Sequence, residues 1–376
     1  MQIILDILFL AFGFLLLAKG ADFFVDGASS VAKKFKIPQL IIGLTIVAMG
    51  TSMPEAAVSI QAALQGNADI SIGNVLGSNI LNILIILGVS SIIFPLLVQK
   101  STQQIEIPIA LGATVLLLLL GLTGVIEWWG GIVLLLGFIG YLTYLFFQAK
   151  NNPDDEEGEG AKDPNITLTL ILSLVGGLVT LCGQFCNSID SIYCLVSGLA
   201  LFISFGGYSL YLFLKNKNKE NVIEEKELPI WKILFFIIIG VAMIIFGSEF
   251  AVKSATSLAK QAGLSDSFIG LTIVALGTSL PELFTSVSAS LKKNSDIAIG
   301  NVVGSNIFNI LFILGITSLI VPINFASSFL IDAGVSIAVT ILLFMLTLKD
   351  RKINWIGGVI MLLGYGAYFT YLLLAL

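Results

Sequence analysis

Two short stretches of this chain combine residue types that could bind a metal ion inside a hydrophobic segment. The sequence GTSMPE occupies 50–55, and GTSLPE occupies 277–282. Proline lacks an N–H and clashes with the carbonyl one turn earlier, so each stretch should break its helix next to two hydroxyls and a glutamate. A carboxylate in apolar surroundings is costly unless it is paired, and it usually marks a functional site. The two stretches therefore indicate a site lined by oxygen.

A second motif follows each stretch and adds more oxygen-bearing side chains. Ser78 and Asn82 lie four residues apart in 71–88, and Ser305 and Asn309 have the same spacing in 298–315. That spacing puts each pair on one face of a helix. The chain contains no histidine. Carboxylate, hydroxyl and carbonyl oxygens without nitrogen or thiolate ligands are the set that hard cations prefer.

The composition excludes a soluble protein. Hydrophobic residues make up 57% of the chain and charged residues only 11%, whereas soluble domains carry about a quarter charged residues. Apolar runs of roughly 20 residues, enough to cross a bilayer, recur along its length, and we interpret the first as a retained helix. The expected spans are 3–32, 38–64, 70–95, 104–123, 126–148, 165–185, 191–214, 229–259, 265–291, 297–321, 326–348 and 354–375.

The chain also contains a long internal repeat. Residues 43–88 align without a gap to 270–315, with 31 of 46 positions identical. Seven expected spans separate the starts of the two units, and because seven is odd, the units should cross the membrane in opposite directions. Inverted repeats with broken helices and a midplane site are typical of secondary transporters. Glu55 and Glu282 are predicted to be the only acidic side chains near the midplane.

The repeat divides the chain into three parts. Residues 1–149 form the first predicted unit, with its most similar segment at 38–95, and 229–376 form the second, with that segment at 265–321. Between them, 150–228 contains an acidic loop, an extra transmembrane hairpin and a charged linker. A solvated loop is favoured over a cation site for the acidic run. For the hairpin's Cys182, Cys186 and Cys194, apolar packing is favoured over a disulfide or a metal site.

Lysine and arginine predict the orientation. Twelve spans with the N-terminus outside place 16 of the 19 Lys and Arg residues on the cytoplasmic side, as the positive-inside rule requires. Both termini are therefore expected outside, in a multi-pass protein of the plasma (inner) membrane. No nucleophile–base pair or Cys/His metal motif indicates an enzyme. No cofactor or nucleic-acid partner is expected, and the oligomeric state stays open, with a monomer plausible.

The motifs GTSMPE and GTSLPE, each followed by GNVxGSNIxNI, resemble the α-repeats of the cation/Ca²⁺ antiporter superfamily, which includes the sodium/calcium exchangers and their prokaryotic relatives. The resemblance covers both α-repeats and the long helices before them. It implies an all-α polytopic membrane protein with two inverted-topology five-helix repeats, here with an extra central hairpin and about 12 transmembrane helices. It also implies that the helices at 3–32 and 229–259 slide against a compact core to alternate access.

The resemblance also implies a ligand set. Its carboxylates would be Glu55 and Glu282; its hydroxyls Thr51, Ser52, Ser78, Thr278, Ser279 and Ser305; its backbone carbonyls those of Ala48 and Ala275; and its amides Asn82 and Asn309. Some members of the superfamily carry an acidic residue where this chain has Asn309, which affects the number of coupled ions. The large cytoplasmic Ca²⁺-sensing domain of the animal exchangers is missing.

These observations predict a secondary active antiporter that exchanges Ca²⁺ for Na⁺ and exports Ca²⁺. Two carboxylates neutralise one Ca²⁺, and many neutral oxygens around only two carboxylates favour Na⁺ as the competing ion. A Ca²⁺/H⁺ antiporter, in which Glu55 and Glu282 exchange protons for the metal ion, is the alternative. A cation channel is a less favoured third class, because channels take acidic rings from rotational symmetry.

Overall fold

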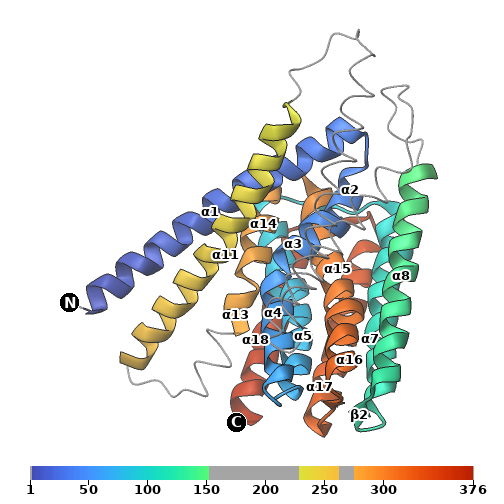
Figure 1. Cartoon of the computed structure of the whole chain (residues 1–376). Coiled ribbons are helices and arrows are strands. Elements are labelled where there is room, and N and C mark those ends of the chain that lie inside the picture. The colour runs from blue at the N-terminus through green and yellow to red at the C-terminus, as the bar shows by residue number, and fades with distance from the viewer. Residues whose placement is uncertain (1, 152–227, 262–274, 376) are drawn as a thin grey trace, which may run out of the picture.

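The computed structural model describes residues 2–151, 228–261 and 275–375. This part of the chain consists of helices joined by short turns, with four strands of two residues each (Figure 1). Eight of its helices are long and apolar enough to cross a membrane, and a bent pair of shorter helices makes a ninth candidate. The protein is therefore a multi-pass integral membrane protein. The predicted count of twelve spans includes the hairpin at 165–214, which lies outside the described residues.

Two long helices, α1 (Gln2–Phe35) and α11 (Ile230–Gln261), lie side by side and are inclined to the rest of the bundle (Figure 1). Their seam is built on glycine: a Cβ added to Gly13 would lie 2.8 Å from the Gly247 carbonyl oxygen, and one added to Gly20 would lie 2.9 Å from that of Gly240. Small residues let helix backbones approach this closely in membranes. Since the earlier glycine of α1 meets the later one of α11, the two helices run antiparallel.

The first copy of the internal repeat begins with a helix that bends. Its pieces are α2 (Gln39–Ile42), the π-helical turn η1 (Gly43–Val47), α3 (Ala48–Thr51) and α4 (Met53–Leu64). The bend of 46° between Thr51 and Met53 lies where Pro54 removes a hydrogen-bond donor. The predicted break is therefore confirmed, and it places Ser52 at the corner and Glu55 in the first turn of α4.

The second copy has the same local structure where it is described. Its helices α13 (Ala275–Thr278) and α14 (Leu280–Leu291) are interrupted at Ser279, just before Pro281. In each copy a further helix follows, interrupted by a π-helical turn that begins at an asparagine. These elements are α5 (Asp69–Leu81), η2 (Asn82–Leu87) and α6 (Gly88–Ile93), then α15 (Ser295–Phe308), η5 (Asn309–Leu314) and α16 (Gly315–Ile320). The helix of the second copy from 295 to 320 is enclosed by protein along most of its length, and only its last residues, Leu319 and Ile320, are exposed.

The remaining helices cover this centre. They are η3 (Thr102–Glu106) with α7 (Ile107–Gly121), α8 (Trp128–Asn151), α17 (Ser327–Thr347) and α18 (Trp355–Ala375). Two antiparallel strand pairs join the halves of the chain: β1 (Leu96–Leu97) pairs with β4 (Lys352–Ile353), and β2 (Val125–Ile126) pairs with β3 (Ile323–Asn324). Each pair thus contains one strand from before and one from after the central 152–227.

Candidate ion-binding site

The two glutamates of the repeated motif lie in one buried cluster, and each is bonded to the other copy. Ser52 Oγ donates to Glu282 Oε1 at 2.8 Å, and Ser279 Oγ donates to Glu55 Oε1 at 3.3 Å. Ser78 Oγ also reaches Glu55 Oε1, at 3.4 Å. Both glutamate side chains are fully buried. Each carboxylate therefore takes a hydroxyl donor from the corner residue of the opposite broken helix.

Four buried oxygen atoms of the predicted ligand residues have no hydrogen-bond partner. They are Glu55 Oε2, Glu282 Oε2, Asn82 Oδ1 and Asn309 Oδ1. The turn η2, which begins at Asn82, contacts α14, and η5, which begins at Asn309, contacts α4. Buried polar groups are normally satisfied, so a group of unpaired acceptors requires an explanation such as an ion. With both glutamates ionised all four are acceptors, and they form two pairs related by the repeat. Only a donor or a cation can satisfy them.

Asn79 and Asn306 hold the two site amides in place by a reciprocal pattern of hydrogen bonds. Asn79 Nδ2 donates to the Asn306 carbonyl and Asn306 Nδ2 to the Asn79 carbonyl, each at 3.1 Å. Asn82 Nδ2 donates to Asn306 Oδ1 at 3.0 Å, and Asn309 Nδ2 to Asn79 Oδ1 at 3.1 Å. We call these four residues the asparagine clasp. Because their nitrogens are used within the clasp, the unpaired Asn82 and Asn309 oxygens are left as acceptors.

A second pair of asparagines, Asn74 and Asn301, supports the backbone beside each glutamate. Asn74 Nδ2 donates to the Glu55 carbonyl at 3.3 Å, and Asn301 Nδ2 donates to the Glu282 carbonyl at 3.2 Å. Each amide also donates to the serine four residues after its glutamate, at 3.0 and 2.8 Å. These bonds join the broken helix of each copy to the helix that follows it.

Thr51, Ser305 and the Ala48 carbonyl form a third contact between the copies. Ser305 Oγ and Thr51 Oγ1 each reach the Ala48 carbonyl at 3.2 Å, and Thr51 Oγ1 also reaches Asn301 Oδ1 at 2.9 Å. The Ser52 amide donates to the same carbonyl at 3.1 Å. The family resemblance implies that this carbonyl is an ion ligand. In this conformation it accepts hydrogen bonds from protein groups and lies among the predicted hydroxyl ligands.

Proline does free a carbonyl in the second copy, at Gly277. That carbonyl, four residues before Pro281, accepts a hydrogen bond from Ser248 Oγ of the long helix α11 at 2.7 Å. The exposed backbone acceptor is therefore satisfied by a neighbouring helix, as membrane proteins require. The equivalent position on α1 is Ala21, which has no hydroxyl.

Glycines allow the first broken helix to lie directly on α15. A Cβ added to Gly300 would lie 2.9 Å from the Gly43 Cα, and one added to Gly304 would lie 2.7 Å from the Leu44 carbonyl oxygen. Backbone atoms cannot move aside cheaply, so only glycine fits this crossing. The close approach places Ser305, next to Gly304, against the carbonyl of Ala48.

The structure thus brings most of the predicted ligand residues together. Ten of the twelve are buried in or beside the cluster described above: Thr51, Ser52, Glu55, Ser78, Asn82, Thr278, Ser279, Glu282, Ser305 and Asn309. Ala48 contributes a backbone carbonyl to the same cluster, and Ala275 begins α13. Whether each residue binds an ion stays a prediction.

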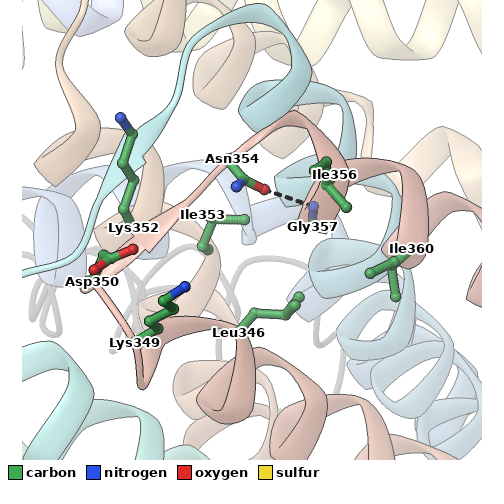
Figure 2. Close-up of a pocket in the computed structure, with 9 residues that line it drawn as sticks. All are labelled: Leu346, Lys349, Asp350, Lys352, Ile353, Asn354, Ile356, Gly357 and Ile360. Atoms are coloured by element: carbon green, nitrogen blue, oxygen red, sulfur yellow. Dashed lines mark hydrogen bonds between the residues drawn. The ribbon is translucent and has the colours of Figure 1, made fainter.

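Sequence reasoning missed several residues with structural roles here. Asn74 and Asn79 of the first copy recur as Asn301 and Asn306 in the second, and this repetition is a signal of a shared contact. No repeated motif points to Glu106, which is fully buried. A small surface hollow of about 170 Å³ lies elsewhere, at the turn between α17 and α18, where it is lined by Lys349, Lys352 and Asn354 among others (Figure 2). It contains none of the predicted ligands.

The described part of the chain is a multi-pass bundle of membrane-spanning helices with two carboxylates buried at its centre. The family model described as "Sodium/calcium exchanger protein" matches residues 5–147 and 232–374. The chain belongs to this family, within the cation/Ca²⁺ antiporter superfamily.

Relatives cover nearly the whole chain. It is 34% identical to the "Putative antiporter CaxA" of Alkalimonas amylolytica, covering 96% of each sequence. It is 32% identical to the "Sodium/calcium exchanger MaX1" of Methanosarcina acetivorans, covering 99% of each. Among solved structures, the sodium-calcium exchanger NCX_Mj soaked with Na⁺ and Ca²⁺ superposes with a TM-score of 0.71 at 29% identity, covering 98% of both chains.

Proposed function

We propose that this protein is a secondary active antiporter that exchanges Ca²⁺ for Na⁺ by alternating access and exports Ca²⁺ across the plasma membrane. One observation carries the proposal: two buried carboxylates from different copies of one motif share a cluster in which four acceptor oxygens are unpaired. Two carboxylates neutralise one Ca²⁺, and oxygen ligands are what Ca²⁺ prefers. The relatives named as exchangers support the same function.

The ligands in this proposal are the twelve predicted residues. Glu55 and Glu282 supply the charge, and Asn82 and Asn309 supply the unpaired amide oxygens. The serines that now bond the carboxylates would turn their oxygens toward a bound cation, since a hydroxyl both donates and accepts. Na⁺ and Ca²⁺ would compete for these oxygens. Because both cannot occupy them, the movement of one ion is coupled to that of the other.

The inverted arrangement of 1–149 and 229–376 is part of the proposal. It is supported by the antiparallel packing of α1 on α11 and by the reciprocal bonds between Asn79 and Asn306. In the alternating-access step, the two long helices slide over the buried centre. The Ser248–Gly277 bond joins α11 to the broken helix α13 and would have to rearrange during that movement.

Proteoliposomes loaded with Ca²⁺ test the function directly. An inward Na⁺ gradient should release Ca²⁺ from vesicles containing the wild-type chain, and a pH gradient at constant Na⁺ should not. Release driven by pH alone would establish the Ca²⁺/H⁺ antiporter instead. Large single-channel currents in planar bilayers would establish a channel. Glu282→Gln vesicles are the matched control, because glutamine keeps the side-chain volume and removes the charge.

The predicted orientation needs a separate test. Both termini should lie outside the cell, which is supported by the number of Lys and Arg residues in the loops assigned to the cytoplasm. A C-terminal reporter that is active only outside the cytoplasm should be active in intact cells. Activity of a cytoplasm-specific reporter at that end would contradict the predicted topology.

A further inference from the structure

The carboxylate of Glu106 forms a second buried polar cluster, separate from the glutamate pair. Glu106 is fully buried at the end of η3, and Tyr144 Oη of α8 donates to its Oε1 at 2.6 Å. Its second oxygen, Oε2, has no partner. A carboxylate enclosed in a membrane protein is costly unless it is protonated or lies beside a compensating positive charge. No Lys or Arg makes an ion pair with it within the described residues.

Further unpaired oxygens belong to residues of the same two elements. The side chains of Thr102 and Gln148 lie within hydrogen-bonding reach of the Glu106 carboxylate, and the buried Tyr141 side chain lies near it. Thr102 Oγ1, Gln148 Oε1 and Tyr141 Oη nevertheless make no well-aligned hydrogen bond, and neither does Ser101 Oγ, just before η3. A proton on Glu106 can be donated to only one acceptor. A metal cation could be bound by several of them at once.

The backbone here has the same local feature as the central site. Asn82 and Asn309 each begin a π-helical turn, and a third such turn, η1, directly precedes Ala48. Glu106 ends the fourth π-helical turn in the described part of the chain, η3. Such turns are rare and often occur at functional sites. In the π geometry, residues four and five apart lie on adjacent turns, so Ser101 and Thr102 lie one turn from Glu106.

Unpaired buried oxygens and a π-helical turn therefore coincide at the central site and again at Glu106. The remaining unpaired atoms in the described residues are single hydroxyls, of Ser90, Thr256, Thr285 and Thr317. We propose that Glu106, with Ser101, Thr102, Tyr141 and Gln148, forms a second cation site that takes one alkali-metal ion, Na⁺ or K⁺. A single carboxylate balances a single positive charge, so a divalent ion would be left under-neutralised.

The ion would enter from the end of the bundle at which Lys100 lies. Gln103 Nε2 donates to the carbonyl of Thr347, the last residue of α17, which places η3 near that end. Tyr144 and Gln148 are only half-buried and lie on the last turns of α8. The predicted topology makes this the cytoplasmic side.

The second half of the chain provides a control: at the repeat offset of 227, Glu106 aligns with Ala333, and the neighbouring residue Asp332 is acidic. Tyr368, which aligns with Tyr141, donates to Asp332 Oδ1 at 2.8 Å. Asp332 is half-buried, and its carboxylate has no unpaired buried oxygen. It is therefore a carboxylate with a tyrosine partner but without the features of a cation site.

Binding of radioactive Na⁺, or of Rb⁺ in place of K⁺, to the purified full-length chain tests this proposal independently of transport. The background is the double variant Glu55→Gln, Glu282→Gln, which lacks the carboxylates of the central site. It should still bind about one alkali ion per chain, because one carboxylate balances one charge. Adding Glu106→Gln should abolish that binding, whereas adding Asp332→Asn should leave it unchanged.

A milder variant protects the test against misfolding. Thr102→Val keeps the side-chain volume and removes one oxygen, so it should weaken alkali-ion binding roughly tenfold, the equivalent of about one hydrogen bond to a charged group. Equal binding by the double variant with and without Glu106→Gln would overturn the proposal. A protonated-carboxyl infrared band that Glu106→Gln removes, and that persists in saturating Na⁺ and K⁺, would overturn it as well.

Discussion

Asn306 gives the sharpest test of how the site is built, because its side chain binds no ion in our proposal. It donates to the Asn79 carbonyl at 3.1 Å and accepts from Asn82 Nδ2 at 3.0 Å. The Asn306→Ala variant removes both bonds and leaves the other residues of the asparagine clasp in place. We expect a loss of stability and a separate loss of Ca²⁺ affinity.

The size of each effect follows from the contacts. The Asn82 amide loses its acceptor, and an unsatisfied buried group costs about 1–3 kcal/mol. The Asn79 carbonyl still accepts the backbone N–H of Asn82, so its lost bond adds only about 0.5–1.5 kcal/mol. The folded state should therefore lose about 1.5–4.5 kcal/mol. Asn82 can then rotate, so its unpaired oxygen is no longer held in one position. Loss of one oriented ligand worth about 1.4 kcal/mol weakens Ca²⁺ binding about tenfold.

The assay combines a Ca²⁺-binding isotherm with a thermal melt on the same purified protein. Asn354→Ala is the matched control: Asn354 Oδ1 caps α18 by accepting from the Gly357 amide at 3.0 Å, away from the glutamates (Figure 2). Removing such a cap costs about 0.5–2 kcal/mol. The control should melt earlier than wild type and bind Ca²⁺ with unchanged affinity.

The refuting result is equally specific. If Asn306→Ala melts earlier and yet binds Ca²⁺ within about twofold of wild type, the clasp only holds helices together. The role assigned to Asn82 would then be wrong. Asn79→Ala should lower the stability and the Ca²⁺ affinity in the same way, because Asn309 Nδ2 donates to Asn79 Oδ1 and would lose that acceptor.

Three further predictions concern the centre of the molecule. Glu55→Gln and Glu282→Gln should each abolish Ca²⁺ transport in proteoliposomes, because each removes one of the two negative charges that balance the ion. The gel-filtration profile of each variant should stay unchanged. Full transport in either variant would exclude that residue from the site. Asn309→Asp should change the pH dependence or ion preference of transport, since it adds a third carboxylate, and an unchanged pH profile would count against Asn309 facing the ion. Gly304→Ala should lower the melting temperature and the Ca²⁺ affinity together, because the new Cβ would lie 2.7 Å from a backbone oxygen, whereas Gly140→Ala, which has open space around it, should change neither.

The sequence was sufficient to predict the broken helices and the buried glutamates. Proline placed the break, and two identical motifs in apolar surroundings indicated that both glutamates share one centre. Spacing along a helix was a poorer guide to contacts. Ser52 and Glu55 are three residues apart, yet the bend at Ser52 turns its hydroxyl toward Glu282 instead. Periodicity describes a continuous helix and gives no information across a break.

The clasp and the Glu106 cluster were beyond the sequence reasoning for different reasons. Asn79 and Asn306 were visible in both motifs, but their bonds join residues 227 positions apart, and only the packing of α5 against α15 brings them together. Glu106 lies near the start of an expected span, where an acidic residue is usually taken to face solvent. The fold instead covers it with α8, which no local pattern predicts.

Each glutamate accepts a hydrogen bond from a serine of the other repeat copy, and this has a consequence for how the protein is assembled. Residues 1–149 contain Glu55 but not its donor Ser279, and 229–376 contain Glu282 but not its donor Ser52. Neither half can complete its own carboxylate environment when it is expressed alone. Co-expressed fragments should therefore recover Ca²⁺ binding only as a heterodimer, and bound Ca²⁺ should slow the dissociation of that heterodimer.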